Sequence, residues 1–351
     1  MAYLSINNVA IRGLAAAVPQ NTINNVEAYN KWGDYSKVEK IIGIKQRHVV
    51  PENMCVSDLF YAAGEKIISE LGWNKEEIDA IVVVCQTPDD IQPPTACILQ
   101  YRLGLSENCF ATDIPHGCSG WVYGLSIISS LMQNGSIRKG LLFSGDTTTK
   151  CVSHEDKSTW PLFGDAGTVT ALEYTGKESN EFLFCLNTNG AGYKDIIIKD
   201  GGYRNPFNEN TLKMVDYGDG VIRNANHLAM EGMSVFSFAI SKAPKQVKEL
   251  ISHFNINEDE IDYYILHQAN MFIDEKIRKK MKLPKEKVLY CIQEYGNTSS
   301  GSIPLTLASQ ASNSLRTKHL KLIGSGFGVG LSWASVYFET ENVICPNIIE
   351  I

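Results

Sequence analysis

Residues 118–146 read "CSGWVYGLSIISSLMQNGSIRKGLLFSGD", and residues 299–327 read "SSGSIPLTLASQASNSLRTKHLKLIGSGF". A Ser-Gly pair stands near the start of both stretches, at Ser119 and at Ser300, and a second pair, at Ser144, recurs at the same separation of 181 residues. An internal repeat of this kind indicates that one supersecondary unit occurs twice in the chain.

The segments that precede these stretches also resemble each other. Residues 74–87 read "NKEEIDAIVVVCQT" and residues 257–269 read "NEDEIDYYILHQA", so that an acidic turn leads through Ile-Asp into an apolar run in both, 183 residues apart. Chance similarity between common α/β patterns is the alternative interpretation. The agreement of order and spacing across two separate segments favours a duplication.

Each unit is predicted to contain a strand, a loop, a long helix and a second strand. Short apolar runs at 80–85 and 263–268 suit strands that are buried on both faces. Apolar residues recur at helical spacing from 121 onwards and stop at Gly135, a residue type that commonly follows a helix, and 140–146 then returns as a strand. Alternating strands and helices predict a layered α/β fold.

Composition narrows the class of protein. The 351 residues carry a formal net charge of −7 without a basic tail or stripe, which argues against nucleic-acid binding. The chain contains no run of about 18 apolar residues, so a membrane-spanning helix is not expected. The N-terminus lacks the basic start of a secretory signal. The nine cysteines include no C-x-x-C pair, which argues against a disulfide framework and a zinc site. We therefore expect a soluble cytoplasmic protein with reduced thiols.

Cys118 stands between glycines, in "GCSG", at the expected start of a helix. A helix N-terminus offers free N–H groups and a positive dipole end, which favour a thiolate. A buried cysteine in a turn is the alternative interpretation. In the second repeat, His267 ends the strand "YYILH", and Asn297 lies in the glycine-flanked loop "YGNTSSG". Each alone could be structural, a packed histidine or a turn residue, but the duplication predicts that all three lie at one centre.

These motifs resemble the thiolase superfamily, and within it the condensing enzymes of the β-ketoacyl-acyl carrier protein synthase III type. The resemblance covers nearly the whole chain and rests on "GIKQRHVV", "GCSGWVYGL", "LFGDAGTVTALE", "LHQAN", "YGNTSSGSIPL" and "GSGFGVGLSWASV". It implies two pseudo-duplicated halves in a layered αβαβα fold: residues 1–180 with the nucleophile Cys118, and residues 181–351 with His267 and Asn297.

The resemblance also implies a mechanism. Cys118 would take an acyl group from a thioester, and the backbone N–H groups of Cys118 and Ser325 would hold the oxyanion. His267 and Asn297 would stabilise the enolate formed when malonyl-acyl carrier protein loses carbon dioxide, and the condensation would yield a β-ketoacyl thioester. Because this needs a neutral His267, activity should fall in acid. The resemblance implies no metal or organic cofactor. It implies that the protein forms a homodimer.

Several positions depart from the housekeeping enzymes that the chain resembles. Lys37 and Ile41 stand where those enzymes contact coenzyme A with Trp and Arg, Lys157 replaces another Arg, and Phe272 replaces an Arg of the carrier-protein docking patch. Lysine does not substitute for arginine at phosphate contacts. We assign Lys37, Lys157, Phe272 and Asn270 to substrate binding. The donor is therefore acyl-coenzyme A or, as the alternative that these departures support, an acyl-carrier protein. A specialised lipid, metabolite or polysaccharide pathway is favoured over fatty-acid initiation.

Lys279 and Lys280 are predicted to dock an acidic acyl carrier protein, with a solvated helix face as the alternative. His116 is expected to pack beneath the corner that carries the cysteine. The Gly- and Asn-rich region 190–226 is expected to be a loop over the substrate entrance.

Three functions fit these patterns. The first is the decarboxylative condensing enzyme. The second is an acyltransferase of the same fold that moves the acyl group from Cys118 to a hydroxyl or an amine. The third is a catalytically silent partner subunit, against which the complete set of Cys118, His267 and Asn297 argues.

Overall fold

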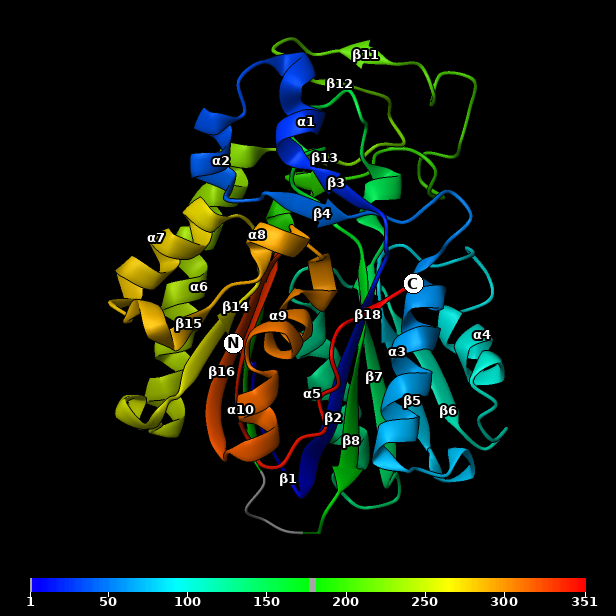
Figure 1. The fold of residues 1–351 in the computed structure, drawn as a ribbon, viewed down its shortest axis with the longest axis vertical. Coiled ribbons are helices and arrows are strands. Elements are labelled where there is room, and N and C mark those ends of the chain that lie inside the picture. Colours follow the sequence, from blue (N-terminus) through cyan, green and yellow to red (C-terminus); the bar gives the residue numbers. More distant parts are fainter. Residues whose placement is uncertain (1, 177–180) are drawn as a thin grey trace.

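The computed structural model describes residues 2–176 and 181–351, and within them two six-stranded sheets form the frame of the molecule (Figure 1). The first sheet has the order β18-β2-β8-β7-β5-β6 and the second has the order β1-β9-β17-β16-β14-β15. The strands of the first sheet are β2 (Val9–Val18), β5 (Ala80–Val84), β6 (Phe110–Ile114), β7 (Lys139–Asp146), β8 (Ala166–Tyr174) and β18 (Ile349–Glu350). Those of the second are β1 (Ala2–Asn7), β9 (Glu181–Thr188), β14 (Tyr263–Leu266), β15 (Val288–Leu289), β16 (Leu320–Gly328) and β17 (Ser332–Thr340).

The two sheets repeat one pairing pattern. In the first, β5 pairs parallel with β6 and with β7, and β7 pairs antiparallel with β8. In the second, β14 pairs parallel with β15 and with β16, and β16 pairs antiparallel with β17. The predicted duplication is therefore confirmed at the level of the fold.

The edge strands cross between the halves that we predicted. β1 pairs with β9 in the second sheet, and β18 pairs with β2 in the first, so each end of the chain completes the sheet of the opposite half. The predicted boundary between residues 180 and 181 lies at the end of the segment 177–180, which is outside the described residues. The division of the chain at this point stays a prediction.

Helices complete five layers. The helices α5 (Gly120–Met132) and α9 (Ser302–Gln310) lie between the sheets and contact strands of both. The outer face of the first sheet is covered by α3 (Val56–Leu71) and α4 (Thr95–Arg102), and that of the second by α6 (Gly232–Phe254) and α7 (Met271–Met281). This is the predicted αβαβα arrangement.

The central layer explains the composition of its helices. A helix between two sheets buries most of its surface, and α5 accordingly buries Trp121, Val122, Leu125 and Ile128 completely. Gly124 lets α5 approach the first sheet closely, because a Cβ there would lie 2.6 Å from Val84 and 2.7 Å from Leu142. The predicted helix ends at Met132, and Gly135 follows with φ +79°.

A cap covers one end of the two sheets, at the top of Figure 1. It contains the hairpin β3 (Thr22–Asn24) and β4 (Gln46–His48), the helices α1 (Asn25–Tyr29), α2 (Ser36–Ile42) and α8 (Ile292–Tyr295), and the long segment from 190 to 230. As predicted, this segment is mostly loop. Its strands have two residues each: β10 (Ile196–Ile197), β11 (Val215–Asp216), β12 (Ile222–Arg223) and β13 (Ala229–Met230). The remaining helix, α10 (Ser312–Thr317), follows α9. None of the described helices combines the length and apolarity needed to cross a membrane.

Candidate active site

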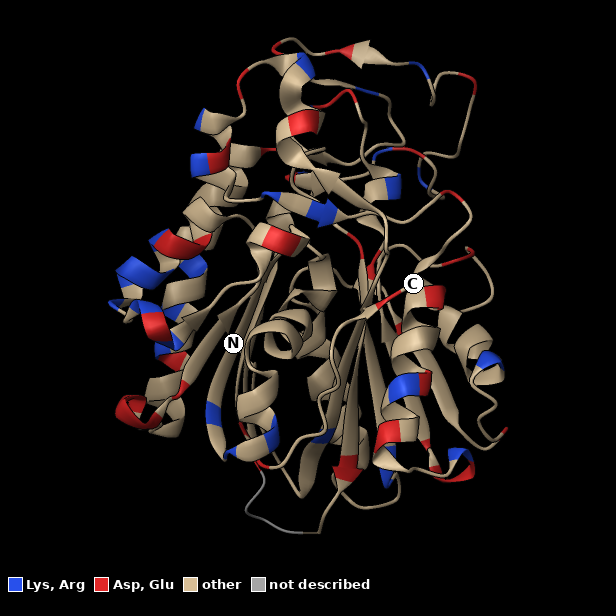
Figure 2. Cartoon of the chain, viewed as in Figure 1, with Lys and Arg blue, Asp and Glu red and all other residues tan. Residues whose placement is uncertain are grey.

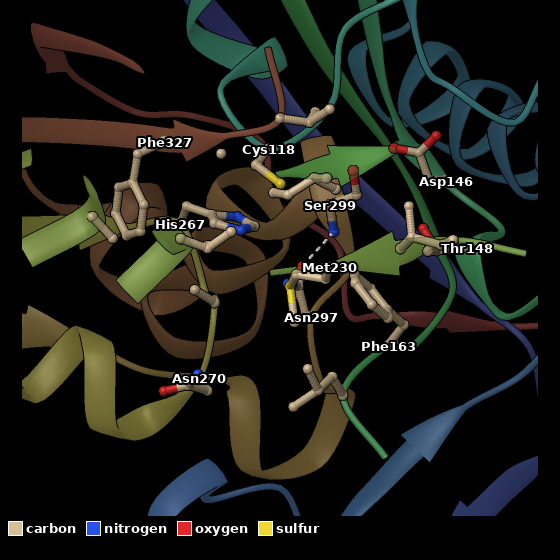
Figure 3. A pocket seen from close by; sticks show the side chains of 18 of the residues that line it. Cys118, Asp146, Thr148, Phe163, Met230, His267, Asn270, Asn297, Ser299 and Phe327 are labelled. Atoms are coloured by element: carbon tan, nitrogen blue, oxygen red, sulfur yellow. Dashed lines mark hydrogen bonds between the residues drawn. The ribbon is translucent and has the colours of Figure 1, made fainter. Parts of the chain in front are cut away.

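A cavity of about 390 Å³ lies beneath the cap, and residues of both repeats form its wall (Figure 3). Cys118 reaches it from the turn between β6 and α5, His267 follows the last residue of β14, and Asn297 belongs to the loop before α9. The structure thus brings together three residues that are up to 179 positions apart in the sequence. Most of the remaining wall is apolar, and it includes Ile196, Leu228 and Met230 from the long cap segment.

The corner that carries Cys118 depends on glycine. A Cβ on Gly117 would lie 2.2 Å from the side-chain oxygen of Gln86, and one on Gly328 would lie 2.6 Å from the sulfur of Cys118. Contacts below 3.0 Å force a neighbour to move. Gly117 therefore leaves room for the Gln86 side chain, and Gly328 leaves room for the Cys118 thiol.

Burial raises the pKa of the Cys118 thiol to about 11. Hydrogen bonds from the backbone of Val329 and of Cys118 itself act in the opposite direction, whereas the nearby Asp146 carboxylate raises the pKa further. Since the raised value exceeds neutral pH, the resting residue is a thiol. The sequence had suggested that the helix start favours a thiolate at Cys118. In the structure the helix start alone does not make Cys118 a thiolate.

Ser325, predicted as the second oxyanion donor, lies elsewhere. It sits inside β16, paired with Leu266 on one side and with Ser335 on the other, and it is fully buried outside the cavity wall. The backbone group that faces the Cys118 sulfur belongs to Val329, in the turn that follows β16. A peptide N–H inside a paired strand is not available to a ligand, whereas one just past the strand end is.

His267 is held by three contacts. Its backbone N–H donates to the carbonyl of Ser325 at 2.8 Å, its Nδ1 lies 2.8 Å from the hydroxyl of Ser302, and its ring packs edge-on against Phe327. Burial lowers the pKa of His267 to about 3, although a hydrogen bond with the backbone of Ser299 opposes this shift. The imidazole is therefore neutral in any ordinary buffer.

Asn297 is fixed through both its backbone and its side chain. Its N–H donates to Leu162 at 2.8 Å, and its carbonyl accepts from Gly164 at 3.1 Å. Its Oδ1 accepts the N–H of Ser299 at 2.9 Å, which identifies that atom as the oxygen because a peptide N–H can only donate (Figure 3). The Nδ2 group consequently remains available as a donor at the cavity.

Two residues that the sequence reasoning missed complete the wall. Asp146 ends β7 and is buried, and its carboxylate accepts hydrogen bonds from the backbone of Gln86 at 2.6 Å and of Thr87 at 3.1 Å. Ser299 lies between Cys118 and Asp146 in Figure 3. The repeat contained a signal for Ser299, since it is the counterpart of Cys118 at the separation of 181 residues.

Two of the predicted substrate residues line the cavity and two do not. Asn270 and Phe272 are part of the wall, where Asn270 also caps α7 by accepting the N–H of Ile273, and the Phe272 ring stacks on Phe236. Lys37 is exposed on α2, and the stem of Lys157 lies beside Gly220 and Trp32 in the cap. Neither lysine touches the cavity wall.

The remaining predicted residues lie on the outside or beneath the site. Lys279 and Lys280 are in the last turn of α7, whose surface carries both basic and acidic residues (Figure 2). Lys280 donates to the carbonyl of Ile240, whereas Lys279 extends to within 4.0 Å of Glu275. His116 lies 3.0 Å from the hydroxyl of Ser119 and packs on Tyr123, which is consistent with a packing role beneath the corner. In the described ranges, no group of three or more His, Cys, Asp or Glu residues is arranged to hold a metal ion.

Comparison with known proteins points to one family. Residues 112–190 match the family of 3-oxoacyl-[acyl-carrier-protein (ACP)] synthase III, and residues 251–340 match the C-terminal part of the same enzymes. Beta-ketoacyl-[acyl-carrier-protein] synthase III of Lactococcus lactis is 32% identical over 334 residues, covering 93% of this chain and 97% of the relative. The enzyme of that name from Streptococcus agalactiae is 35% identical over 300 residues, covering 84% and 87%. The crystal structure of a 3-oxoacyl-(acyl-carrier protein) synthase from Burkholderia xenovorans superimposes with a TM-score of 0.92 at 34% identity, covering 100% and 99%.

Proposed function

Because the chain belongs to the 3-oxoacyl-[acyl-carrier-protein] synthase III family, we propose that it is an acyltransferase that condenses an acyl group with a malonyl unit. Cys118 takes the acyl group from a thioester donor, and malonyl-acyl carrier protein then loses carbon dioxide and attacks the acyl-cysteine to give a β-ketoacyl thioester. The observation that carries this proposal is the meeting of Cys118, His267 and Asn297 at one apolar cavity.

In the first half-reaction the Cys118 sulfur attacks the carbonyl carbon of the donor. The backbone N–H groups of Cys118 and Val329 point at the sulfur and donate to the oxyanion that forms beside it. The donor thiolate leaves as the carbonyl re-forms. A covalent acyl-enzyme divides one difficult transfer into two easier steps.

In the second half-reaction His267 and Asn297 bind the thioester carbonyl of the malonyl group. The Nδ1 of His267 lies 2.8 Å from the Ser302 hydroxyl. We assign the hydroxyl as the donor in this pair, which leaves the ring proton on Nε2, and Asn297 contributes its free Nδ2 group. Two neutral donors stabilise the enolate oxygen as carbon dioxide leaves, and each is worth about 10²- to 10³-fold in rate. With a pKa of about 3, His267 stays neutral far below pH 6.5, so the acid limb expected from an ordinary histidine moves to much lower pH.

The acyl donor of this chain is a carrier protein rather than coenzyme A, and the pathway is a specialised one. The support is that the positions which recognise coenzyme A in the housekeeping enzymes hold Lys37, Ile41 and Lys157 here, none of which lines the cavity. The exposed lysines of α7, Lys279 above all, provide positive charge for an acidic carrier on the helix whose start, at Asn270 and Phe272, forms part of the cavity wall. Lys280 serves less well, because its Nζ already binds the carbonyl of Ile240.

The functional unit is a homodimer formed through the β6 edge of the first sheet. The support is that, in the part of the chain that the structure describes, β6 has a partner strand on only one side, and every residue of β6 is exposed or half-buried. Exposed apolar side chains surround this edge, with Phe110 in the strand, Tyr101 in the adjoining α4, and Ile91 in the loop that Asp113 fastens through the backbone of Thr95. Unpaired edges with apolar neighbours are sites of strand pairing between chains.

A donor panel tests the first half-reaction. The protein is incubated with acyl-coenzyme A and acyl-carrier substrates of several chain lengths, and the mass of the Cys118 peptide is followed. We expect an acyl adduct on Cys118 from carrier-bound donors, much slower loading from coenzyme A, and none in Cys118→Ala. Adducts that form equally well from both donors contradict the carrier preference alone. Adducts that pass to an alcohol or amine, without consuming malonyl groups, contradict the condensation.

A further inference from the structure

Ser299 is part of the cavity wall together with Cys118, Asp146, His267 and Asn297. Its backbone binds the side chains of both Asn297 and His267. Its hydroxyl lies on the cavity wall with the Cys118 thiol and the Asp146 carboxyl group, and it lowers the pKa of both. The residue is buried, and only 6% of its surface is exposed. Figure 3 shows it between Cys118 and Asp146.

The backbone of Ser299 is held in an unusual conformation. Its φ angle is +52°, in the left-handed region that residues with a side chain other than Asn and Asp rarely adopt. Such a conformation persists only where the surroundings enforce it, and it is concentrated at functional sites. Here the enforcing contacts are those with Asn297 and His267, and the result is that the hydroxyl points between sulfur and carboxylate.

Asp146 is a buried acid without a cation. Within residues 2–176 and 181–351, no Lys or Arg forms an ion pair with it, and its negative charge is balanced only by hydrogen-bond donors. These donors include the backbone of Gln86, the hydroxyl of Thr87 at 3.2 Å and the hydroxyl of Ser300 at 3.3 Å. Burial raises the pKa of Asp146, which makes the carboxylate a better proton acceptor than an exposed one.

We propose, building on the acyl-enzyme mechanism above, that Ser299 and Asp146 form the route by which Cys118 loses its proton when the acyl group is loaded. The S–H bond of Cys118 breaks as an O–H bond to Ser299 forms, while the original O–H bond of Ser299 breaks and its proton passes to a carboxylate oxygen of Asp146. The freed electron pair on sulfur attacks the donor carbonyl. When the donor thiolate leaves, the proton returns to it through Ser299, so no other reactant is consumed.

This assignment separates the two half-reactions. Loading uses the Cys118–Ser299–Asp146 side of the cavity, whereas decarboxylation uses the neutral donors His267 and Asn297 on the other side. His267 therefore keeps its proton on one nitrogen throughout and does not have to act as a base.

The variant Ser299→Gly tests the route, because glycine accepts a positive φ angle and removes the hydroxymethyl side chain while keeping the backbone groups that bind Asn297 and His267. Alkylation of Cys118 by iodoacetamide, followed by the mass of its peptide from pH 5 to 10, reports the thiolate without any acyl donor. We expect the rate at pH 7 to fall about tenfold or more, the loss typical of a hydrogen bond to a charged group, and acyl loading to fall in parallel. Once fully acylated, the variant should release carbon dioxide from malonyl-acyl carrier protein at a rate within about twofold of the parent.

Thr298→Val is the matched control. Thr298 is the neighbouring residue, and its buried hydroxyl has no hydrogen-bond partner among the described residues, so its removal should leave alkylation and loading unchanged. The titratable groups that share the wall with Cys118 are Asp146, His267 and Cys151. His267, with a pKa of about 3, and Cys151, with a pKa raised to about 11, do not titrate near pH 7.

Two results would overturn the proposal. Normal alkylation and loading in folded Ser299→Gly would show that the hydroxyl is not needed. An equal loss in loading and in decarboxylation would show that Ser299 only supports the loop. Asp146→Asn gives an independent reading: loading slows if Asp146 takes the proton, but alkylation accelerates if Asp146 acts only by repelling the thiolate, and acceleration would contradict the route. Because alkylation needs no acyl donor, these outcomes are distinct from a failure to find any substrate.

Discussion

Asn297 contributes to the site through its side-chain nitrogen, Nδ2, because its side-chain oxygen already has a partner. Its oxygen is committed to the Ser299 N–H at 2.9 Å, and only its nitrogen can donate to a ligand. Asn297→Asp keeps the acceptor for Ser299 and removes the donor. We expect this variant to load Cys118 normally and to lose about 10²- to 10³-fold in malonyl decarboxylation, measured as carbon dioxide release from the acylated enzyme. Decarboxylation at the parental rate would remove Asn297 from the second half-reaction.

Gly328 leaves room for the nucleophile. A Cβ at this position would lie 2.6 Å from both the Cβ and the sulfur of Cys118. We expect Gly328→Ala to displace the thiol and to lower the loading rate by at least about tenfold, since small misplacements at a reacting centre cost that much or more. Gly202→Ala is the control, because no atom lies within 4 Å of a Cβ there. Equal loading rates in the two variants would contradict the close fit around Cys118.

At the scale of single elements, helix α7 contains a buried carboxyl group that lowers the stability of the folded protein, which the sequence pattern of the helix does not reveal. Asp274 in its first turn is fully buried, and neither of its oxygens has a well-formed hydrogen bond with any residue in the ranges 2–176 and 181–351. Burial raises the pKa of Asp274 well above the ordinary value. In the unfolded chain an aspartate titrates near pH 3.9. The carboxyl group therefore lowers the free energy of unfolding progressively as the pH rises above about 4.

Asp274→Asn, which stays neutral, should remove this pH-dependent cost. We expect the variant to unfold at a higher temperature than the parent at pH 7, by the equivalent of about 1–3 kcal/mol for a buried unsatisfied group, and to show no such advantage near pH 4. Thermal unfolding at the two pH values measures this. A variant that is less stable at pH 7 would show that the Asp274 carboxylate is stabilised in the folded protein.

Elements were easier to predict from the sequence than contacts between them. The duplication placed Cys118, His267 and Asn297 at corresponding strand ends and loops, and paired sheets bring such positions together. Ser325 was misplaced because the family resemblance locates the C-terminal glycine-rich segment but not the residue at which strand pairing stops. Val329, in the turn just beyond the strand, has the usable N–H. The contact of Ser299 with Asp146 depends on a positive φ angle, which residue pattern alone does not reveal for a serine.

At the scale of the whole molecule, the exposed edge of the first sheet predicts the assembly. Phe110, 45% exposed in β6, would be covered in a dimer formed through that edge. We expect Phe110→Lys to shift the protein from dimer to monomer at micromolar concentration, because a charge on an edge strand opposes pairing. Phe207→Lys, at an exposed position in the long cap segment, is the control. Light scattering after size exclusion measures both, and a parent protein that is already monomeric would contradict the dimer.

The account as a whole depends on coupling between Cys118 acylation and malonyl decarboxylation in one cavity. The most direct measurement supplies malonyl-acyl carrier protein, labelled in the free carboxyl carbon, to enzyme whose Cys118 has been acylated to completion. We predict one labelled carbon dioxide for each acyl group lost from Cys118, with the β-ketoacyl product appearing on the carrier. Loss of the acyl group without labelled carbon dioxide, or a product on a hydroxyl or amine, would contradict the account.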